Sequence, residues 1–573
     1  MVKDTAPGDV ISPSAANSSD GHIVRHRTRS IGHLSTTNGP DGARALSSDS
    51  QDGADSDDAQ LQAEFGYKPV FKREFGYLST FSFAVSISGL FATTMTTYSY
   101  PLSAGGAAAA VWCWLIAGSG CMCLAFSVAE LVSAYPTSGG LYYTVSRLAP
   151  QKYVPVISWI TGWINLLGQI AGVASSEYGA AQMLLAAVAM GTDFKYEITE
   201  NTTVGVMAAL TVLTGLVNSL STYWIEKMTK GYVIFHIAVL VSCCIALLVK
   251  TENKNTASFV FTEIESSSGW QPKGFSFLFG FLSVAWTMTD YDATAHITEE
   301  ISNPAKKAPW AISAAMTFTY IGGFLFNIVL GFCMGPSSAD ILGAYQPVAM
   351  IFYNSLGKAG GIFYTVCGFI IIKFVCFTAL QATARTFFAF SRDRLIPFSH
   401  VWTQVSPISG TPLTSVWLSV ILCILINLIG LGSYTAISGV FNVCAISLDI
   451  SYCIPIACKL IFGQFKPGPW HMGRFSKYIN AWACIWTAFV SVIFILPTQY
   501  PVAADTMNYA CVFLVAIFFF AYLYWIVRGK RFYTGPIVEG YETPQVGEER
   551  ESGVSGEEKA GELAGEKVGE KVA

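Results

Sequence analysis

Two stretches, FSFAVSISGLFATTM at Phe81–Met95 and FLSVAWTMTDYDATA at Phe281–Ala295, decide how this chain is interpreted. Each is an apolar run interrupted near its middle by small or polar residues, at 86–89 and at 287–290. Interrupted hydrophobic segments at corresponding places in two halves of a chain are typical of transporters that bind a solute between two broken membrane helices. Broken backbone cannot face lipid, so both interruptions must face protein or a water-filled cavity.

The composition indicates a membrane protein. Of the 573 residues 52% are hydrophobic and 13% charged, whereas a soluble domain has about 25% charged residues. The net charge of -4 and the lack of a basic patch argue against nucleic-acid binding. The 14 cysteines lie mostly singly in apolar runs, with no repeated CxxC pair, so we expect no metal and no cofactor.

We predict an all-α protein with twelve membrane spans, because a spanning helix needs about 20 mostly apolar residues. The predicted spans are 75–98, 108–133, 153–190, 203–222, 230–249, 273–297, 309–334, 361–390, 412–431, 434–461, 478–498 and 507–527. The third is long and is expected to tilt or break near Ser175-Ser176. Residues 66–532 form the predicted transporter domain, between disordered cytosolic tails at 1–65 and 533–573.

The distribution of Lys and Arg predicts that both termini are cytosolic. The predicted inner flanks and loops hold eighteen: Lys68, Lys72, Arg73, Arg147, Lys152, Lys227, Lys230, Lys306, Lys307, Arg392, Arg394, Lys459, Lys466, Arg474, Lys477, Arg528, Lys530 and Arg531. The outer loops hold five: Lys195, Lys250, Lys254, Lys273 and Lys358. The sequon Asn201-Thr202-Thr203 falls on a predicted outer loop, where it could be glycosylated.

Three longer motifs resemble amino acid permeases of the amino acid–polyamine–organocation superfamily. They are AELVSAYPTSGGLYYTVSRLAP (Ala129–Pro150), YDATAHITEEISNPAKKAPWAI (Tyr291–Ile312) and ARTFFAFSRDRLIP (Ala384–Pro397). FKPGPWHMGRFS (Phe465–Ser476), DTMNYACV (Asp505–Val512) and FYTGP (Phe532–Pro536) are similar to its fungal GABA, polyamine and choline branch. The resemblance implies a LeuT-type fold: two inverted repeats of five helices, broken helices 1 and 6, and helices 11 and 12 outside the core.

Candidate substrate-binding residues lie at the two interruptions: Ser86, Ile87, Ser88, Gly89, Leu90, Trp286, Thr287, Thr289 and Asp290. A half-helix beginning after Gly89 would present free N–H groups to a carboxylate; the alternative is that these small residues only allow close helix packing. The resemblance makes Trp286 an aromatic roof over the substrate. Asp290 stands where relatives have a small residue, and could pair with a substrate ammonium or point into vestibule water.

Three further residues are candidates for proton coupling. His236 stands where many relatives carry a cationic Lys in place of a bound sodium, and it titrates near neutral pH; a packing histidine is the alternative. Lys373 and Asp449 are charges inside apolar spans. Either they pair with each other, or they belong to a proton route.

Charged residues at the predicted cytosolic helix ends are candidates for an inner gate: Glu130, Glu299, Glu300, Arg392 and Asp393. The alternative for each is a solvated interface charge. Arg25-His26-Arg27-Thr28-Arg29-Ser30 suits a basophilic kinase, and Lys3 and the C-terminal lysines suit a ubiquitin ligase.

The sequence therefore predicts a multi-pass importer of GABA, a related amino acid or an amine, coupled to protons and working by alternating access. We expect it in the plasma membrane, with the vacuolar membrane as the alternative. A polyamine or choline transporter, a transporter-like nutrient sensor, and an exporter or organellar exchanger remain alternatives. An enzyme is disfavoured because the 7 histidines are scattered and form no catalytic cluster.

Overall fold

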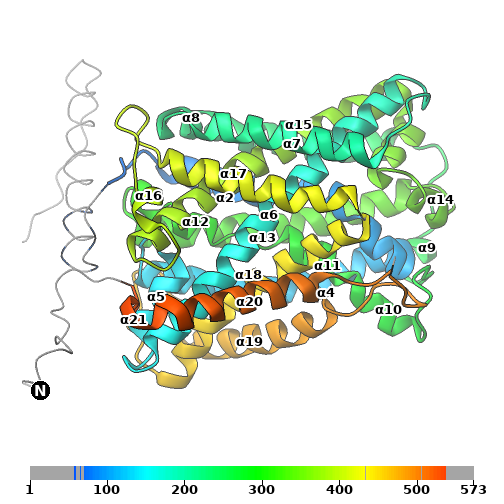
Figure 1. The fold of residues 1–573 in the computed structure, drawn as a ribbon. Helices are drawn as coiled ribbons and strands as arrows, with labels where there is room; N and C mark the ends of the chain where they lie inside the picture. Colours follow the sequence, from blue (N-terminus) through cyan, green and yellow to red (C-terminus); the bar gives the residue numbers. More distant parts are fainter. Residues whose placement is uncertain are drawn as a thin grey trace, which may run out of the picture. The chain divides into compact units, whose positions relative to one another are not determined.

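Long helices lie side by side in the computed structural model of the chain (Figure 1). The structure describes residues 70–536 except 433 and 505, and also the single residues 57, 59, 63, 65 and 67. For residues 434–436 it describes the backbone but not the side chains. The described part is all-helical and contains no β-strand, as predicted.

The helices of the first half are α2 (Tyr77–Ser88), α3 (Leu90–Thr97), α4 (Ser99–Ala134), α5 (Gly140–Leu148), α6 (Val154–Gly191), α7 (Glu200–Asn218), α8 (Thr222–Lys250) and α9 (Ala257–Phe261). Those of the second half are α10 (Lys273–Phe279), α11 (Phe281–Thr287), α12 (Ala293–His296), η1 (Thr298–Glu300), α13 (Pro304–Cys333), α14 (Ser338–Leu342), α15 (Pro347–Arg392), α16 (Ser399–Trp402), α17 (Leu413–Asn427), η2 (Leu428–Leu431) and α18 (Tyr434–Phe462). The remaining elements are η3 (Gly473–Phe475), α19 (Ser476–Ile493), α20 (Ala510–Tyr524), η4 (Trp525–Gly529) and α21 (Lys530–Phe532).

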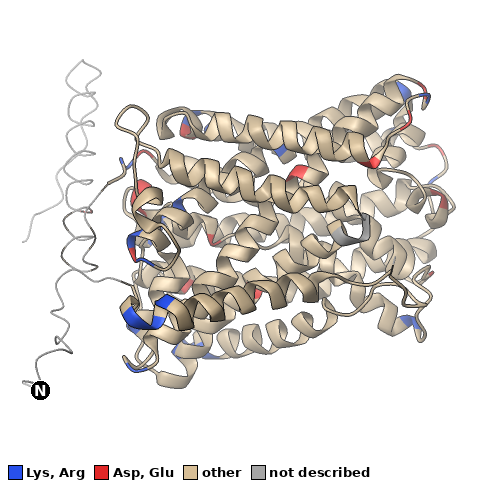
Figure 2. Ribbon diagram, in the orientation of Figure 1, with Lys and Arg blue, Asp and Glu red and all other residues tan. Residues whose placement is uncertain are grey.

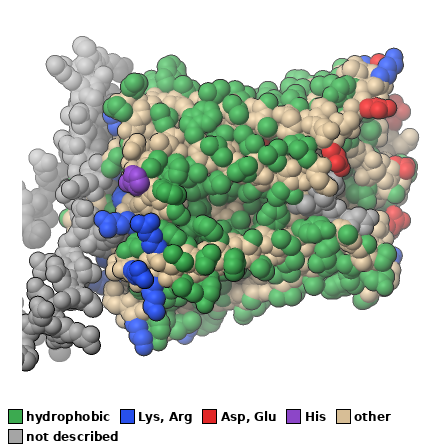
Figure 3. Space-filling view, viewed as in Figure 1, with side chains coloured by type: hydrophobic (Ala, Val, Ile, Leu, Met, Phe, Trp, Pro, Cys, Tyr) green, Lys and Arg blue, Asp and Glu red, His purple; other side chains and the backbone are tan. Residues whose placement is uncertain are grey.

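Within the described residues, ten helices are long and apolar enough to cross a membrane. The predicted spans at 273–297 and 478–498 correspond to the shorter α10–α12 and to α19, so the count of twelve stays a prediction. Apolar side chains cover much of the flank in view (Figure 3), and Val249, Ile461 and Phe519 are among the exposed ones. Such a surface is suited to lipid.

The first predicted interruption is a real break between α2 and α3. Gly89 has φ +43°, in the left-handed region, so the helical path stops there and restarts. A Cβ at Gly89 would lie 2.2 Å from Val375 Cγ2 of α15, so only glycine fits this close approach. The second interruption follows α11, where Met288–Asp292 separate α11 from α12 and Asp290 has φ +59°.

The packing of the long helices relates the two halves of the chain. Counting each broken helix as the first of its half, α4 packs on α13, α6 on α15 and α7 on α17. The second helix of the first half therefore packs on the second helix of the second half, and the third and fourth helices of the two halves pair in the same way. A two-fold relation between the halves produces this pairing, as expected for inverted repeats.

The third predicted span contains no break. Helix α6 is continuous from Val154 to Gly191, and the Ser175 hydroxyl donates to Ala171 O at 2.7 Å within the helix. Hydroxyls that bond back to their own helix do not interrupt it, so the alternative of a break at Ser175-Ser176 was wrong.

We call the two ends of the helix bundle the α5 end and the α9 end, after the short helices that lie there (Figure 1). Most of the predicted tails, including Lys3 and the 25–30 segment, lies outside the described residues. Of the residues near the tail boundaries that are described, Phe65, Tyr67 and Tyr533 are buried. Phe65 and Tyr67 both pack on Tyr143 of α5, so they belong to the α5 end.

Candidate substrate site

The first break uses its serines to contact two neighbouring helices. Ser86 Oγ donates to Phe374 O of α15 at 3.2 Å, and Thr319 Oγ1 of α13 donates to Ser88 Oγ at 2.8 Å. Ile87 and Leu90 are buried beside them. These contacts hold α2 between α13 and α15.

The amides at this break already have partners. Gly89 N–H donates to Val85 O at 3.0 Å, and Phe91 N–H donates to His236 Nε2 of α8 at 3.2 Å. In this conformation Nε2 of His236 is an acceptor, so the ring carries its proton on Nδ1, 3.3 Å from Tyr232 Oη. The prediction that the Ser88 and Gly89 amides bind a carboxylate stays a prediction, and requires the last turn of α2 to open.

The second break concentrates buried polar atoms that have no hydrogen-bond partner within the described part of the protein. They are Thr287 Oγ1, Thr289 Oγ1, Asp290 Oδ1, Tyr291 Oη and Thr294 Oγ1. Asp290 Oδ2 lies toward α6, 3.9 Å from where a Cβ of Gly172 would be. Buried polar groups usually have partners, so this cluster indicates a place where a polar solute binds.

An aromatic layer covers this cluster. Trp286, the second-last residue of α11, donates from Nε1 to Ser175 Oγ at 3.0 Å, and its ring lies 4.9 Å from Phe441 of α18. Phe441 in turn lies 6.2 Å from Tyr178 and 6.3 Å from Tyr100. That Trp286 covers a bound substrate stays a prediction.

Two cavities lie beyond this aromatic layer. One, of about 100 Å³, is lined by Tyr100, Tyr178 and Phe441 among others. The other, of about 390 Å³, shares Tyr100 and also contacts Phe279 and Asn508. Side chains of the layer thus separate the break of 287–292 from hollow space in the protein.

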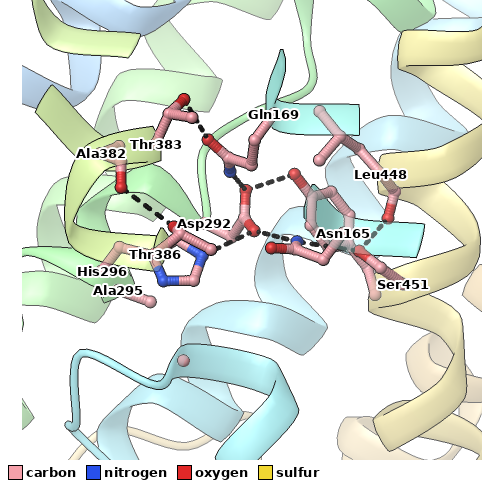
Figure 4. A network of polar contacts seen from close by, with 12 residues as sticks. Asn165, Gln169, Asp292, Ala295, His296, Ala382, Thr383, Thr386, Leu448 and Ser451 are labelled. Carbon is pink, nitrogen blue, oxygen red and sulfur yellow. Dashed lines mark hydrogen bonds and ion pairs between the residues drawn. The ribbon is translucent and has the colours of Figure 1, made fainter. Parts of the chain in front are cut away.

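Directly after the second break, Asp292 is the centre of a buried network (Figure 4). Asn165 Nδ2 donates to its Oδ2 at 2.8 Å, Gln169 Nε2 to its Oδ1 at 3.3 Å, and Tyr452 Oη to Oδ1 at 2.5 Å. His296 Nε2 lies 3.3 Å from Oδ2, near enough for an ion pair although the angle is poor for a hydrogen bond. The network joins α6, α12 and α18 at one carboxylate.

Ion pairs close the structure toward the α5 end. Glu299 pairs with Arg392 Nη2 at 3.1 Å, and Glu300 pairs with Arg385 Nε at 2.7 Å. Burial acts to raise the pKa of Glu299, but Arg392 and the hydrogen bonds from Ser138 outweigh it and hold the pKa below its ordinary value. These pairs tie η1 to α15.

The other predicted gate residues have different partners. Asp393 accepts a hydrogen bond from Tyr67 Oη at 3.2 Å, beside the Glu299–Arg392 pair, because Tyr67 lies 3.7 Å under the Arg392 guanidinium. Glu130 pairs with Lys459 at 2.6 Å and so joins α4 to α18. Four of the five predicted gate residues therefore gather with η1 and α15, and Glu130 belongs to a separate pair.

The alternative that Lys373 pairs with Asp449 was wrong. Lys373 Nζ lies 2.8 Å from both carboxylate oxygens of Glu177 on α6, and Thr214 and the Leu210 carbonyl complete its shell at 2.7 and 3.2 Å. Asp449 is buried on α18, and its Oδ2 has no hydrogen-bond partner among the described residues.

Sequence reasoning missed four charged or titratable residues of these clusters: Glu177, Asp292, His296 and Arg385. Glu177 is a charge inside an apolar run, as Lys373 is, so the criterion that selected Lys373 could also have selected Glu177. Asp292, His296 and Arg385 lay inside the quoted motifs, but only the folded chain shows that Asp292 meets His296 and that Arg385 meets Glu300.

Two broken helices around a cluster of unpartnered polar atoms, inside an apolar helical bundle, define a membrane transporter. Residues 75–518 match the family described as Amino acid permease. An uncharacterized amino-acid permease of Schizosaccharomyces pombe is 58% identical, over 84% of this chain and 90% of the relative. Amino-acid permease 2 of Neurospora crassa is 49% identical over 87% and 92%, and amino-acid permease BAT1 of Arabidopsis thaliana is 32% identical over 84% and 96%.

The chain therefore belongs to the amino acid permease family, a family of multi-pass membrane transporters. The predicted superfamily is confirmed. The GABA, polyamine and choline branch is not distinguished by these relatives and stays a prediction.

Proposed function

We propose that this permease imports a small amino acid with separated charges, of which GABA is the type, and that it uses the proton gradient. The observation that supports the substrate class is Asp290, a buried carboxylate at the second break with an oxygen free of partners. It stands among hydroxyls and below Trp286, so a substrate ammonium would meet both a carboxylate and an aromatic face. The α2–α3 break would receive the substrate carboxylate.

Alternating access is supported by the uneven closure of the two ends. Ion pairs, with Phe65 and Tyr67 packed beside them, close the α5 end, whereas an aromatic layer of single side chains separates the site from the cavities beyond Trp286. Rotation of a few aromatic side chains needs less rearrangement than breaking buried ion pairs. We infer that the site is reached from the Trp286 side in this conformation.

The substrate class is tested by Asp290→Asn, which keeps the shape and removes the charge. Loss of a hydrogen bond to a charged group costs about 1.5–3 kcal/mol, so the affinity for amines should fall about ten-fold or more. Competition by GABA, putrescine, choline and neutral α-amino acids should be measured in wild type and variant. Asp340→Asn, at an exposed carboxylate, is the matched control. Unchanged affinity for every amine in Asp290→Asn would remove this carboxylate from the substrate site.

The coupling proposal concerns His236. Protonation of Nε2 would break its bond to the Phe91 N–H, so the charge of this ring would act directly on the first break. Uptake should follow an imposed pH gradient and ignore sodium, and His236→Ala should lose pH-driven accumulation. His236→Gln offers an acceptor without a titratable proton and should also fail. Full recovery in His236→Gln would show that His236 serves only as an acceptor, and a strict sodium requirement would exclude proton coupling.

A further inference from the structure

His296 stands between two acceptors. Nδ1 lies 2.9 Å from Ser138 O, in the connector between α4 and α5, and Nε2 lies 3.3 Å from Asp292 Oδ2. The ring packs against Gly140, where a Cβ would lie 3.0 Å from His296 Cε1. The side chain is 1% exposed, so both contacts are buried.

An imidazolium would donate to Ser138 O and also form an ion pair with Asp292, whose Oδ2 lies 3.3 Å from Nε2. A neutral imidazole has one N–H donor, so it would turn a lone pair either toward the carbonyl of Ser138 or toward the carboxylate of Asp292. Asp292 in turn receives donors from Asn165, Gln169 and Tyr452, which suits the ionised carboxylate. The geometry therefore fits a charged pair that holds one proton on the ring.

The contact at Ser138 leads on to the α5 end. Ser138 donates to Glu299 Oε1 from its N–H at 3.1 Å and from its hydroxyl at 2.5 Å. Glu299 holds Arg392, and Arg392 lies over Tyr67. The 135–139 connector is thus clamped between His296 on one side and the Glu299–Arg392 pair on the other.

We propose that Asp292 and His296 together bind one exchangeable proton, and that this proton holds the 135–139 connector, and with it the α5 end, closed. Loss of the proton removes one of the two His296 contacts. By linkage, opening of the α5 end lowers the affinity of the pair for the proton, so the proton leaves toward the side that opens. The coupling role rests on the proposed proton-driven uptake; the proton-dependent closure does not.

Other ionisable groups lie around this pair. On the elements packed against α12 they are Tyr77 of α2, Tyr142, Tyr143 and Arg147 of α5, Glu299 and Glu300 of η1, Lys306 and Lys307 of α13, and Arg385, Arg392 and Asp393 at the end of α15. Asp290 and Tyr291 precede the pair in the chain, and the Tyr291 ring lies 5.0 Å from that of Tyr452. On α18, which contacts Asp292 through Tyr452, Asp449 and Cys444 are buried and ionisable as well. Because Arg392 and Ser138 hold the pKa of Glu299 low, Glu299 stays charged where an imidazole titrates.

Hydrogen–deuterium exchange of the full-length protein in detergent, from about pH 5.5 to about pH 8.5, tests the proposal across the range in which an imidazole titrates. In wild type the protection factors of 136–140 and 70–76, corrected for intrinsic exchange, should fall about ten-fold or more as pH rises, as expected for loss of a charge-assisted contact. Peptides from 262–272, at the α9 end, should not change. His296→Gln should show low protection at every pH, and His400→Gln, at an exposed histidine, should behave as wild type.

Unchanged pH dependence in His296→Gln, or a flat wild-type profile, overturns the proposal. Should His296→Gln fail to give monodisperse protein, the wild-type and His400→Gln profiles decide: a shared fall supports it and flat profiles overturn it. Wild type that shows the protection change, yet accumulates nothing on a pH gradient, retains this proton site and loses the proposed coupling. Wild type that accumulates substrate on a pH gradient without any protection change would retain the proposed coupling and lose this proton site.

Discussion

Buried charges in the spans differ in how they are satisfied. Lys373 and Glu177 form a pair in which every strong donor and acceptor is met, with help from Thr214. Asp290 and Asp449 each have a buried oxygen that no described residue partners. A satisfied pair is a fixed structural link, whereas an unpartnered carboxylate can meet a substrate or a proton. This difference separates Lys373 from Asp449, which the sequence alone presents alike as charges inside apolar spans.

Substitution of Lys373 alone should be much worse than substitution of both partners. Lys373→Met leaves Glu177 charged and buried, which costs about 3–5 kcal/mol, whereas apolar replacement of a whole buried pair is often neutral. We expect a large loss of thermal stability in Lys373→Met and substantial recovery in Glu177→Met/Lys373→Met, measured by size-exclusion after heating.

The same double variant tests the proton route. If it accumulates substrate on a pH gradient as wild type does, Lys373 has no part in coupling. A double variant as unstable as the single one would show that the pair is not what makes Lys373 necessary.

At the scale of elements, the breaks depend on backbone conformations that few residues adopt. Gly89 separates α2 from α3 with positive φ and lies directly against Val375 of α15. Asp290 has positive φ without being glycine, which is uncommon and places its carboxylate beside Gly172 of α6. Strain of this kind is found at functional sites, and here it falls at the proposed substrate site.

Gly89→Ala should therefore damage the first break. The left-handed conformation costs an L-residue about 1–2 kcal/mol, and overlap with Val375 Cγ2 at 2.2 Å adds to that cost. We expect reduced uptake and a lower melting temperature, partly restored in Gly89→Ala/Val375→Ala. Gly231→Ala, where no atom lies within 4 Å of the new Cβ, is the matched control. Wild-type uptake and stability in Gly89→Ala would mean that the break tolerates a side chain.

At the scale of the whole described bundle, charge gathers at its two ends. Figure 2 shows Lys and Arg at the α5 end, with other charged residues at the α9 end and few between them. Lys358 of the predicted outer set pairs with Asp193 at 2.5 Å, and Arg392 and Lys459 of the inner set lie in pairs with Glu299 and Glu130. Which end of the bundle faces the cytosol is a proposal.

Glycosylation distinguishes the two orientations. With the α5 end in the cytosol, Asn201 at the start of α7 is accessible to glycosylation and Asn17, in the sequon Asn17-Ser18-Ser19 of the N-terminal segment, is not. Asn201→Gln should abolish a glycosidase-sensitive mobility shift in a eukaryotic host, and Asn17→Gln should leave it unchanged. A shift that depends on Asn17 would reverse the orientation.

The sequence by itself determined the class, the family and the places of both breaks. Apolar runs of membrane length, and the polar or glycine residues inside them, are local properties of the sequence. They can be recognised without knowing how the helices pack. It also marked Asp290 as a carboxylate inside an apolar run, and the family resemblance marked Trp286.

Only the tertiary structure decided which charges meet. Lys373 pairs with Glu177, 196 positions away, and Asp292 gathers donors from α6 and α18. Hydropathy indicates that burying a charge is costly, but it does not identify the partner residue that offsets this cost. The continuity of α6 was likewise settled by hydroxyls that bond within the helix, a choice that the residue types Ser175-Ser176 leave open. Partners are set by the angles and register at which helices pack, and those depend on the whole chain.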